Sequence, residues 1–165
     1  MNDKFSPFLC GFRKGHSTQH ALLKLLENWR KHLDNNELVG TILCDLSKAF
    51  DTLAHDLIIA KLDAYGFGYK SLKFISSYLS DRKQRCKVSN SYSSWLDILT
   101  GVPQGSVLGP LLFNIFINNF LFLFTNDSIF NFADDDSLYT HGKTIDIVVN
   151  NLEKEARKAI TWLEI

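Results

Sequence analysis

Three consecutive carboxylates stand in Phe132-Ala133-Asp134-Asp135-Asp136-Ser137-Leu138-Tyr139, directly after the apolar run 128–132. Apolar residues on both flanks predict two strands joined by a tight turn, with the acids at its tip. Neighbouring carboxylates repel each other, so such a cluster favours a bound cation or open water. Mg²⁺ prefers oxygen ligands and is usually held by one or two carboxylates together with substrate phosphates. A solvated acidic turn is the alternative, and this stretch alone leaves both open.

A second acid, Asp45, ends the branched-residue run Leu38–Asp45, which predicts a buried strand. A carboxylate at a strand terminus projects into a cleft while the strand itself stays buried. A split βαββαβ sheet sets its central strands side by side, so an α+β layer would bring Asp45 to the Asp134-Asp135 turn. Divalent ions held between these acids suit in-line phosphoryl or nucleotidyl transfer.

Helical periodicity covers much of the remaining chain. It predicts helices from residue 17 or 18 to about 34, over 55–65 and 69–79, after Pro110, and over 145–163. Short strands are expected near 85–89 and 95–99. In the first helix Ala21, Leu22, Leu25, Trp29 and Leu33 recur at helical spacing, and we interpret this stripe as core.

The composition describes one globular domain or part of a larger one, since 45% of its 165 residues are hydrophobic and 22% are charged. The 18 basic and 18 acidic residues cancel, so no overall basic field indicates a nucleic-acid partner. Any such interaction must come from local clusters.

The sequence indicates an intracellular protein, in the nucleus or the cytoplasm, without a membrane partner. Its three cysteines are too far apart for a zinc pattern and are typical of a reducing compartment. The N-terminus leads into no apolar signal segment. The apolar stretch Leu111–Phe124 is too short and too polar to span a bilayer, and we expect a buried helix there.

Three loops have compositions that suggest binding, and each also has a plain reading. Gly11–His16 is basic and glycine-flanked, which suits a phosphate or a solvated loop. Gly101–Pro110 lets a backbone approach a ligand closely, with Gln104 as a hydrogen-bonding side chain, or is a plain connector. Asp81–Lys87 is the concentrated basic run, and it forms either a solvated strand edge or a track for a nucleic-acid backbone.

Taken together, four stretches in this order and spacing resemble the fingers–palm core of a reverse transcriptase of the non-LTR retrotransposon kind. They are Gly11-Phe12-Arg13-Lys14-Gly15-His16-Ser17-Thr18, Asp45-Leu46-Ser47-Lys48-Ala49-Phe50-Asp51, Gly101-Val102-Pro103-Gln104-Gly105-Ser106-Val107-Leu108-Gly109-Pro110-Leu111-Leu112-Phe113 and Phe132-Ala133-Asp134-Asp135. They cover nearly the whole chain.

The resemblance implies a catalytic and metal-binding set of Asp45, Asp134 and Asp135. Asp45 and Asp134 match the two aspartates that coordinate both catalytic Mg²⁺ ions, for which Mn²⁺ is a possible substitute. Asp135 matches the second, supporting acid of the turn. Asp136 lies outside the motif and is left out of this set.

The resemblance also implies contacts to the deoxynucleotide and the template. Phe50 matches a steric gate that rejects a 2′-hydroxyl, because a bulky ring leaves no room for the extra oxygen. Gln104 and Gly105 match the loop that lines the nucleotide pocket and template. The remaining implied contacts to the triphosphate are Arg13, Lys14 and the backbone of Leu46, Ser47, Lys48 and Ala49.

The implied fold is an α+β right-hand palm with a split βαββαβ antiparallel sheet, helices on one face, and part of the fingers. We expect a single, incomplete domain over 1–165, with fingers over about 1–40 and palm over about 41–165. The last palm strand, the primer grip, the thumb and the endonuclease are expected in the rest of a longer polyprotein.

The implied function is RNA-directed DNA polymerase, with an RNA template, a DNA primer and deoxynucleoside triphosphates as partners. The alternative is a truncated, inactive remnant of a retroelement that acts at most as a nucleic-acid-binding or interaction module. An unrelated metal-dependent phosphotransferase would need all four stretches to match by accident.

Overall fold

The computed structural model describes residues 4–125 and 128–164. The chain divides into two compact units, one formed by the chain up to Ser47 together with the part from Ile117 onward, and the other by Lys48–Phe116. Each unit is described by itself.

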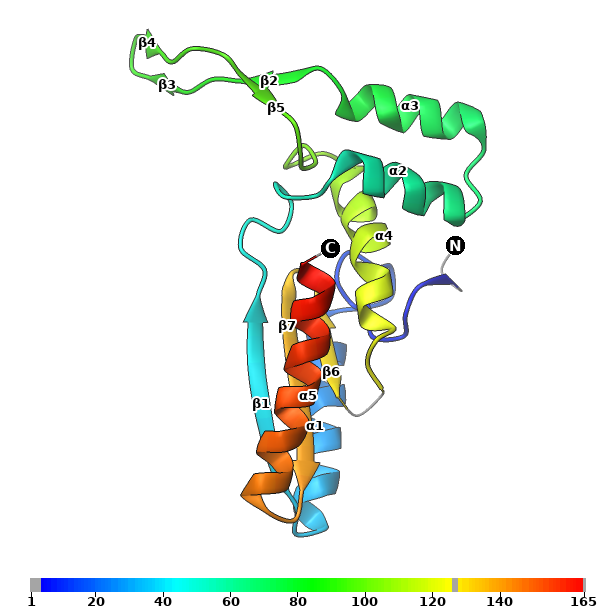
Figure 1. Cartoon of the computed structure of the whole chain (residues 1–165), viewed down its shortest axis with the longest axis vertical. Helices are drawn as coiled ribbons and strands as arrows, with labels where there is room; N and C mark the ends of the chain where they lie inside the picture. The colour runs from blue at the N-terminus through cyan, green and yellow to red at the C-terminus, as the bar shows by residue number, and fades with distance from the viewer. Residues whose placement is uncertain (1–3, 126–127, 165) are drawn as a thin grey trace. The chain divides into compact units, whose positions relative to one another are not determined.

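The first unit is built on a three-stranded antiparallel sheet (Figure 1). Its strands are β1 (Leu38–Asp45), β6 (Ile129–Phe132) and β7 (Asp135–Gly142), in the order β1-β7-β6. Strand β7 pairs with β1 over its whole length and with β6 through a tight hairpin. The prediction that the strand ending in Asp45 lies beside the acidic hairpin is therefore confirmed. The expectation that this strand is buried is wrong, because β1 lies at the edge of the sheet and each of its residues is half-buried or exposed.

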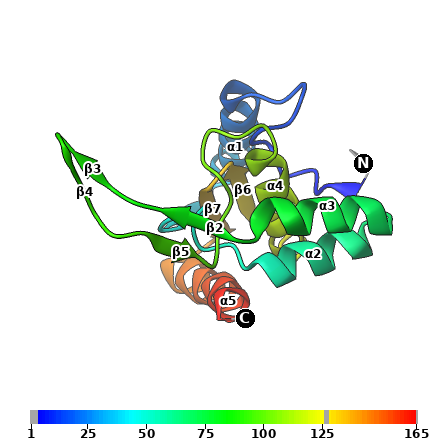
Figure 2. The ribbon, with the colours of Figure 1, turned by 90° about the horizontal axis from the view of Figure 1, so that it is seen from above.

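Helices cover both faces of this sheet, so the expectation of helices on one face is wrong. Helix α1 (Thr18–Asp34) lies on one face and α5 (Ile145–Leu163) on the other, with the sheet between them in Figure 2. On the first face Asn28 Nδ2 donates to the hydroxyl of Tyr139 at 2.9 Å. On the second, Thr140 Oγ1 donates to the carbonyl of Val148 at 3.1 Å. The adjacent residues Tyr139 and Thr140 are both buried, as expected for a central strand covered on both sides.

Helix α1 starts and packs in ways that its sequence predicts in part. Ser17 caps it by accepting a hydrogen bond from the backbone N–H of His20 at 3.3 Å. Ala21 and Leu25 are buried as expected, but Leu22 and Leu33 are 51% and 56% exposed. The buried face is narrower than the apolar stripe because one helix face alone meets the sheet.

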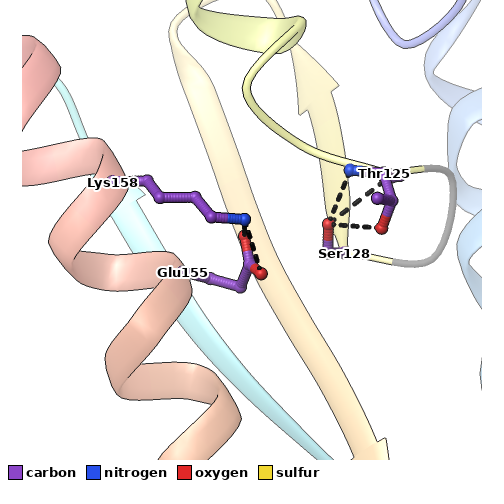
Figure 3. A network of polar contacts seen from close by, with 4 residues as sticks. All are labelled: Thr125, Ser128, Glu155 and Lys158. Atoms are coloured by element: carbon purple, nitrogen blue, oxygen red, sulfur yellow. Dashed lines mark hydrogen bonds and ion pairs between the residues drawn. The ribbon is translucent and has the colours of Figure 1, made fainter.

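Figure 3 shows two groups of polar contacts, one directly before β6 and one on α5. The backbone N–H of Thr125 donates to Ser128 Oγ at 3.0 Å, and Ser128 Oγ donates to the Thr125 carbonyl at 3.2 Å. Ser128 is buried, so these bonds satisfy a hydroxyl placed directly before the strand. On α5, Lys158 and Glu155 form an ion pair of 2.9 Å one turn apart.

The second unit contains a helical pair and an extended ribbon. Helices α2 (His55–Ala64) and α3 (Tyr69–Leu79) lie side by side, and their buried residues include Ile58, Leu62, Ile75 and Leu79 (Figures 1 and 2). After α3 the chain forms β2 (Arg82–Gln84), which pairs with β5 (Leu96–Ile98), and β3 (Lys87–Val88), which pairs with β4 (Ser91–Tyr92). The strands expected near 85–89 and 95–99 are thus shorter than expected.

Helix α4 (Gly109–Leu121) starts in the second unit and ends in the first. Its many buried residues, such as Phe113, Ile117 and Leu121, confirm the prediction of a buried helix after the glycine-rich loop. Within the described residues, every helix is too short or too polar to cross a bilayer.

Candidate active site

Two carboxylates oppose each other across the end of the β1–β7 ladder. Asp45 and Asp135 are direct partners in the antiparallel register, and both are exposed. The Cβ atoms of such partners lie roughly 4.5–5.5 Å apart on the same face of a sheet, and like charges at this separation destabilise it. A cation between these two residues would remove that repulsion.

The third acid lies in the loop between β6 and β7. Phe132 pairs with Asp135, so Ala133 and Asp134 form a two-residue hairpin loop. Ala133 has φ +58°, the left-handed region that such tight loops require and that glycine usually fills. Placing a residue with a side chain there costs about 1–3 kcal/mol, so the surrounding structure must hold the turn.

Buried polar side chains next to this turn form hydrogen bonds that fix its conformation. Asn131 Nδ2 donates to the Ala133 carbonyl at 2.8 Å and to Asp136 Oδ1 at 3.0 Å. Asp136 is 2% exposed, and burial raises its pKa to about 7, an effect that the Asn131 hydrogen bond opposes and the charges of Asp135 and Asp134 reinforce. Asp136 is therefore a structural carboxyl beneath the exposed acids.

The glycine-flanked basic loop packs against the same turn. Leu9 forms a parallel bridge with Asn131. A methyl group at Gly11 would overlap the backbone of Ala133, so only glycine fits at this close approach. The sequence motif that begins at Gly11 is thereby tied to the Ala133-Asp134 turn, a link that no local pattern could reveal.

The side chain of Arg13 forms hydrogen bonds to backbone carbonyls that precede it in the chain. Its Nη1 donates to the carbonyls of Ser6 at 3.0 Å and Leu9 at 3.3 Å, and its side chain is partly buried. Lys14 is exposed. The segment before this loop is anchored by Asn118, whose Oδ1 accepts from the buried N–H of Ser6 at 2.7 Å. Sequence reasoning missed Asn118, because its role depends on a partner at the far end of the chain.

The second unit brings together two of the stretches that the sequence singled out. Gln104 Nε2 donates to Asp51 Oδ1 at 2.9 Å, and the N–H of Val102 donates to the Phe50 carbonyl at 2.9 Å. The ring of Phe50 stacks on Phe113, with centroids 4.6 Å apart. The segment after Asp45 and the Gly101–Gly105 loop therefore lie side by side.

A polar pocket of about 620 Å³ opens beside this junction in the second unit. Its lining includes Lys48, Asp51, Arg82 and Gln104. Gly105 has φ +76°, and the place where a Cβ would lie is open, as expected for a loop that a ligand can approach. Leu46 is partly buried and Ser47 exposed; both belong, with the three acids, to the first unit.

A separate cluster of potential metal ligands lies at the other end of the β1–β7 ladder. Glu37 Oε2 accepts from His32 Nδ1 at 2.8 Å and from His141 Nδ1 at 2.9 Å. The two imidazole rings are stacked, with centroids 3.5 Å apart and planes 16° from parallel. This geometry fits a hydrogen-bonded clamp, and the His32 bond is the main cause that lowers the pKa of Glu37.

Comparisons with known proteins converge on one family. Residues 1–164 match the family model for reverse transcriptase (RNA-dependent DNA polymerase). The chain is similar to the probable RNA-directed DNA polymerases from transposon BS and from transposon X-element of Drosophila melanogaster. It is 40% identical to the first over 64% of this chain, and 32% identical to the second over 76%. It is also 28% identical, over 95% of its length, to the RNA-directed DNA polymerase from mobile element jockey of the same species. These matches cover 12%, 14% and 18% of the relatives, so the chain spans less than a fifth of each.

Proposed function

The chain belongs to the reverse transcriptase (RNA-dependent DNA polymerase) family, and we propose that it is the catalytic core of a longer non-LTR retrotransposon polyprotein. In that role it adds deoxynucleotides to the 3′-hydroxyl of a DNA primer on an RNA template. The observation that carries the proposal is the direct pairing of Asp45 with Asp135 beside the Ala133-Asp134 turn.

The three acids fit divalent ions by their chemistry. They offer carboxylate oxygens alone, which suits Mg²⁺, with Mn²⁺ as a substitute. Asp45 and Asp134 would hold two ions, and Asp135 would support them. When bound, such a pair activates the attacking oxygen and stabilises the leaving oxygen of an in-line displacement. The chain's own contribution is a rigid turn, held by Asn131 from below and by the close contact with Gly11.

The nucleotide would be positioned by residues of two motifs, the one that begins at Asp45 and the one that begins at Gly101. Phe50 would act as the steric gate against a 2′-hydroxyl, and its stacking on Phe113 supports this role because a fixed ring excludes better than a mobile one. Gln104 and Gly105 would line the pocket and the template. The triphosphate would be contacted by the backbone of Leu46, Ser47, Lys48 and Ala49, and by Arg13 and Lys14 after release of the hydrogen bonds within the Arg13 loop.

The finer fold that we propose is a right-hand palm of split βαββαβ type. The order β1, helices, β6, β7, α5 is compatible with that motif without its final strand. Leu9 already lies along β6, whereas the outer edge of β1 has no strand partner among the described residues. A further palm strand would therefore pair with β1, and it would lie in the longer polyprotein together with the thumb.

The decisive experiment measures Mg²⁺- or Mn²⁺-dependent incorporation of deoxynucleotides on an RNA template with an annealed DNA primer. The full chain is compared with Asp134→Asn and with Glu153→Gln, an exposed acid on α5 that serves as the matched control. We expect activity in the wild type and the control, and its loss in Asp134→Asn. If the wild type is silent, the assay is repeated in the longer polyprotein. Silence there too would contradict the proposal and favour an inactive remnant.

A further inference from the structure

The basic run of the sequence forms half of an exposed ribbon that the polymerase assignment does not use. We name residues 82–98 the basic arm. It consists of the β2–β5 and β3–β4 pairs, joined where Cys86 and Ser93 exchange hydrogen bonds, at 2.9 Å to Ser93 Oγ and 3.0 Å to the Cys86 carbonyl. Every residue from 83 to 97 is exposed. A two-stranded ribbon without a buried face is marginally stable in water, so folding stability alone does not explain this arm.

The arm concentrates positive charge that the chain as a whole lacks. Its four cations are Arg82, Lys83, Arg85 and Lys87, against the single acid Asp97, while the whole chain has a net charge of zero. Asp97 pairs with Lys83 at 3.3 Å. Arg85 and Lys87 therefore stand without an acidic neighbour on the arm.

Two aromatic rings accompany these cations on the surface. Tyr92 and Trp95 are 52% and 57% exposed. The guanidinium of Arg85 lies over both rings, 4.1 Å from the centroid of Tyr92 and 4.5 Å from that of Trp95. Lys87 Nζ is 5.5 Å from the Tyr92 centroid. The cations lie on the first half of the arm and the rings on the second, and the pairing of the two halves brings them into contact.

This combination of exposed cations and exposed rings favours one class of partner. Arg, Tyr and Trp are enriched at protein–protein interfaces, but Lys and Ser are depleted there, and the arm carries Lys83, Lys87 and four serines. Single-stranded nucleic acid has the matching chemistry, because its phosphates attract cations and its unpaired bases stack on aromatic and guanidinium planes. A duplex hides its base faces and would contact the cations alone.

We propose that the basic arm binds unpaired RNA, with Arg85 and Lys87 on phosphates and Tyr92 and Trp95 stacking on bases. The identification of this strand as the template rests on the proposed polymerase function; the binding itself does not. On binding, bases would replace the guanidinium of Arg85 on the faces of the two rings. The displaced guanidinium could then contact a phosphate.

The test measures binding of a fluorescently labelled, unstructured RNA oligonucleotide to the full chain by anisotropy. The background is Asp134→Asn, so that polymerase activity plays no part in the readout. Tyr92→Ala/Trp95→Ala and Arg85→Ala/Lys87→Ala are each expected to weaken binding about tenfold or more, because the first removes the stacking surfaces and the second the phosphate contacts. The charge variant should also reduce the slope of log affinity against log salt by about 1.4, for two phosphate contacts.

Two controls keep the result specific. Lys70→Ala/Lys73→Ala removes two exposed cations of α3 and should change affinity less than twofold. Tyr92→Phe/Trp95→Phe keeps the ring faces and should bind RNA as the wild type does. The affinity for duplex RNA should not change when the rings are removed. Equal weakening in the α3 variant, or wild-type affinity in both arm variants, would overturn the proposal. If RNA binds through the arm while the polyprotein has no polymerase activity, the arm proposal stands and the polymerase proposal fails.

Discussion

The acidic end of the β1–β7 ladder and the basic arm are both clusters of like charge, and they are built in opposite ways. The acidic end of the β1–β7 ladder stands on buried groups: Asn131 and Asp136 lie beneath the turn and Gly11 packs against it. The basic arm has no buried support, and its cations rest on exposed rings. Contacts buried in a core preserve a geometry, whereas exposed cation–π contacts can be exchanged for a ligand at low cost.

The largest expected effect is the pH dependence caused by Asp136. Its pKa is raised to about 7 in the folded state, so between the unfolded value of 3.8 and about 7 the folded protein binds more protons than the unfolded chain. The free energy of unfolding should therefore fall as pH rises through this window, by on the order of a few kcal/mol. Asp136→Asn keeps the acceptor for Asn131 and should remove most of this dependence.

The measurement is urea unfolding of both proteins from pH 4 to pH 8 in EDTA. Parallel pH profiles for the wild type and Asp136→Asn would show that the buried carboxyl does not titrate in this window.

Gly11→Ala should destabilise the first unit by about 1–3 kcal/mol, because the added methyl group overlaps the Ala133 backbone in a packed region. Gly68→Ala is the matched control, since that glycine has open space around it and no positive φ. Chemical denaturation of the two variants gives the comparison. Equal stability would mean that the basic loop does not pack on the turn.

Asp45→Asn should stabilise the metal-free protein by roughly 0.2–1 kcal/mol, because it removes the repulsion between directly opposed carboxylates. A gain in stability would be informative, because the same substitution should abolish polymerase activity if the proposed function holds. Thermal unfolding in EDTA and again with Mg²⁺ measures it. A loss of stability in EDTA would show that the two acids are not in repulsive contact.

The smallest effect on global stability is expected for Arg85→Ala. Each exposed cation–π contact contributes about 0.5–1 kcal/mol, and only to the arm. The global unfolding midpoint should stay unchanged while hydrogen exchange of amides in residues 82–98 becomes faster. A shift of the whole transition would show that the arm is coupled to the cores, and would remove the contrast between the two regions.

Much of this arrangement could be predicted from local patterns. The acidic hairpin, the strand ending in Asp45 and the five helices are each encoded within short windows by alternation, helical spacing and turn residues. Of the three acids expected at the hairpin tip, only Asp134 lies in the loop, and Asp135 and Asp136 belong to β7. The order of the four motifs identified the family. The strands of the basic arm were less well predicted, because a ribbon without a buried face has weak alternation.

The sequence by itself thus determined where acids, turns and helices occur, because those preferences act between residues close in the chain. The tertiary structure alone decided where each acid lies. Asp135 and Asp136 are neighbours of the same type, yet Asp135 is exposed opposite Asp45 while Asp136 is buried on Asn131. Successive strand residues point to opposite faces, and which face is covered depends on helices and loops from distant parts of the chain. The same reason placed α1 and α5 on opposite faces of the sheet and fitted Gly11 against Ala133.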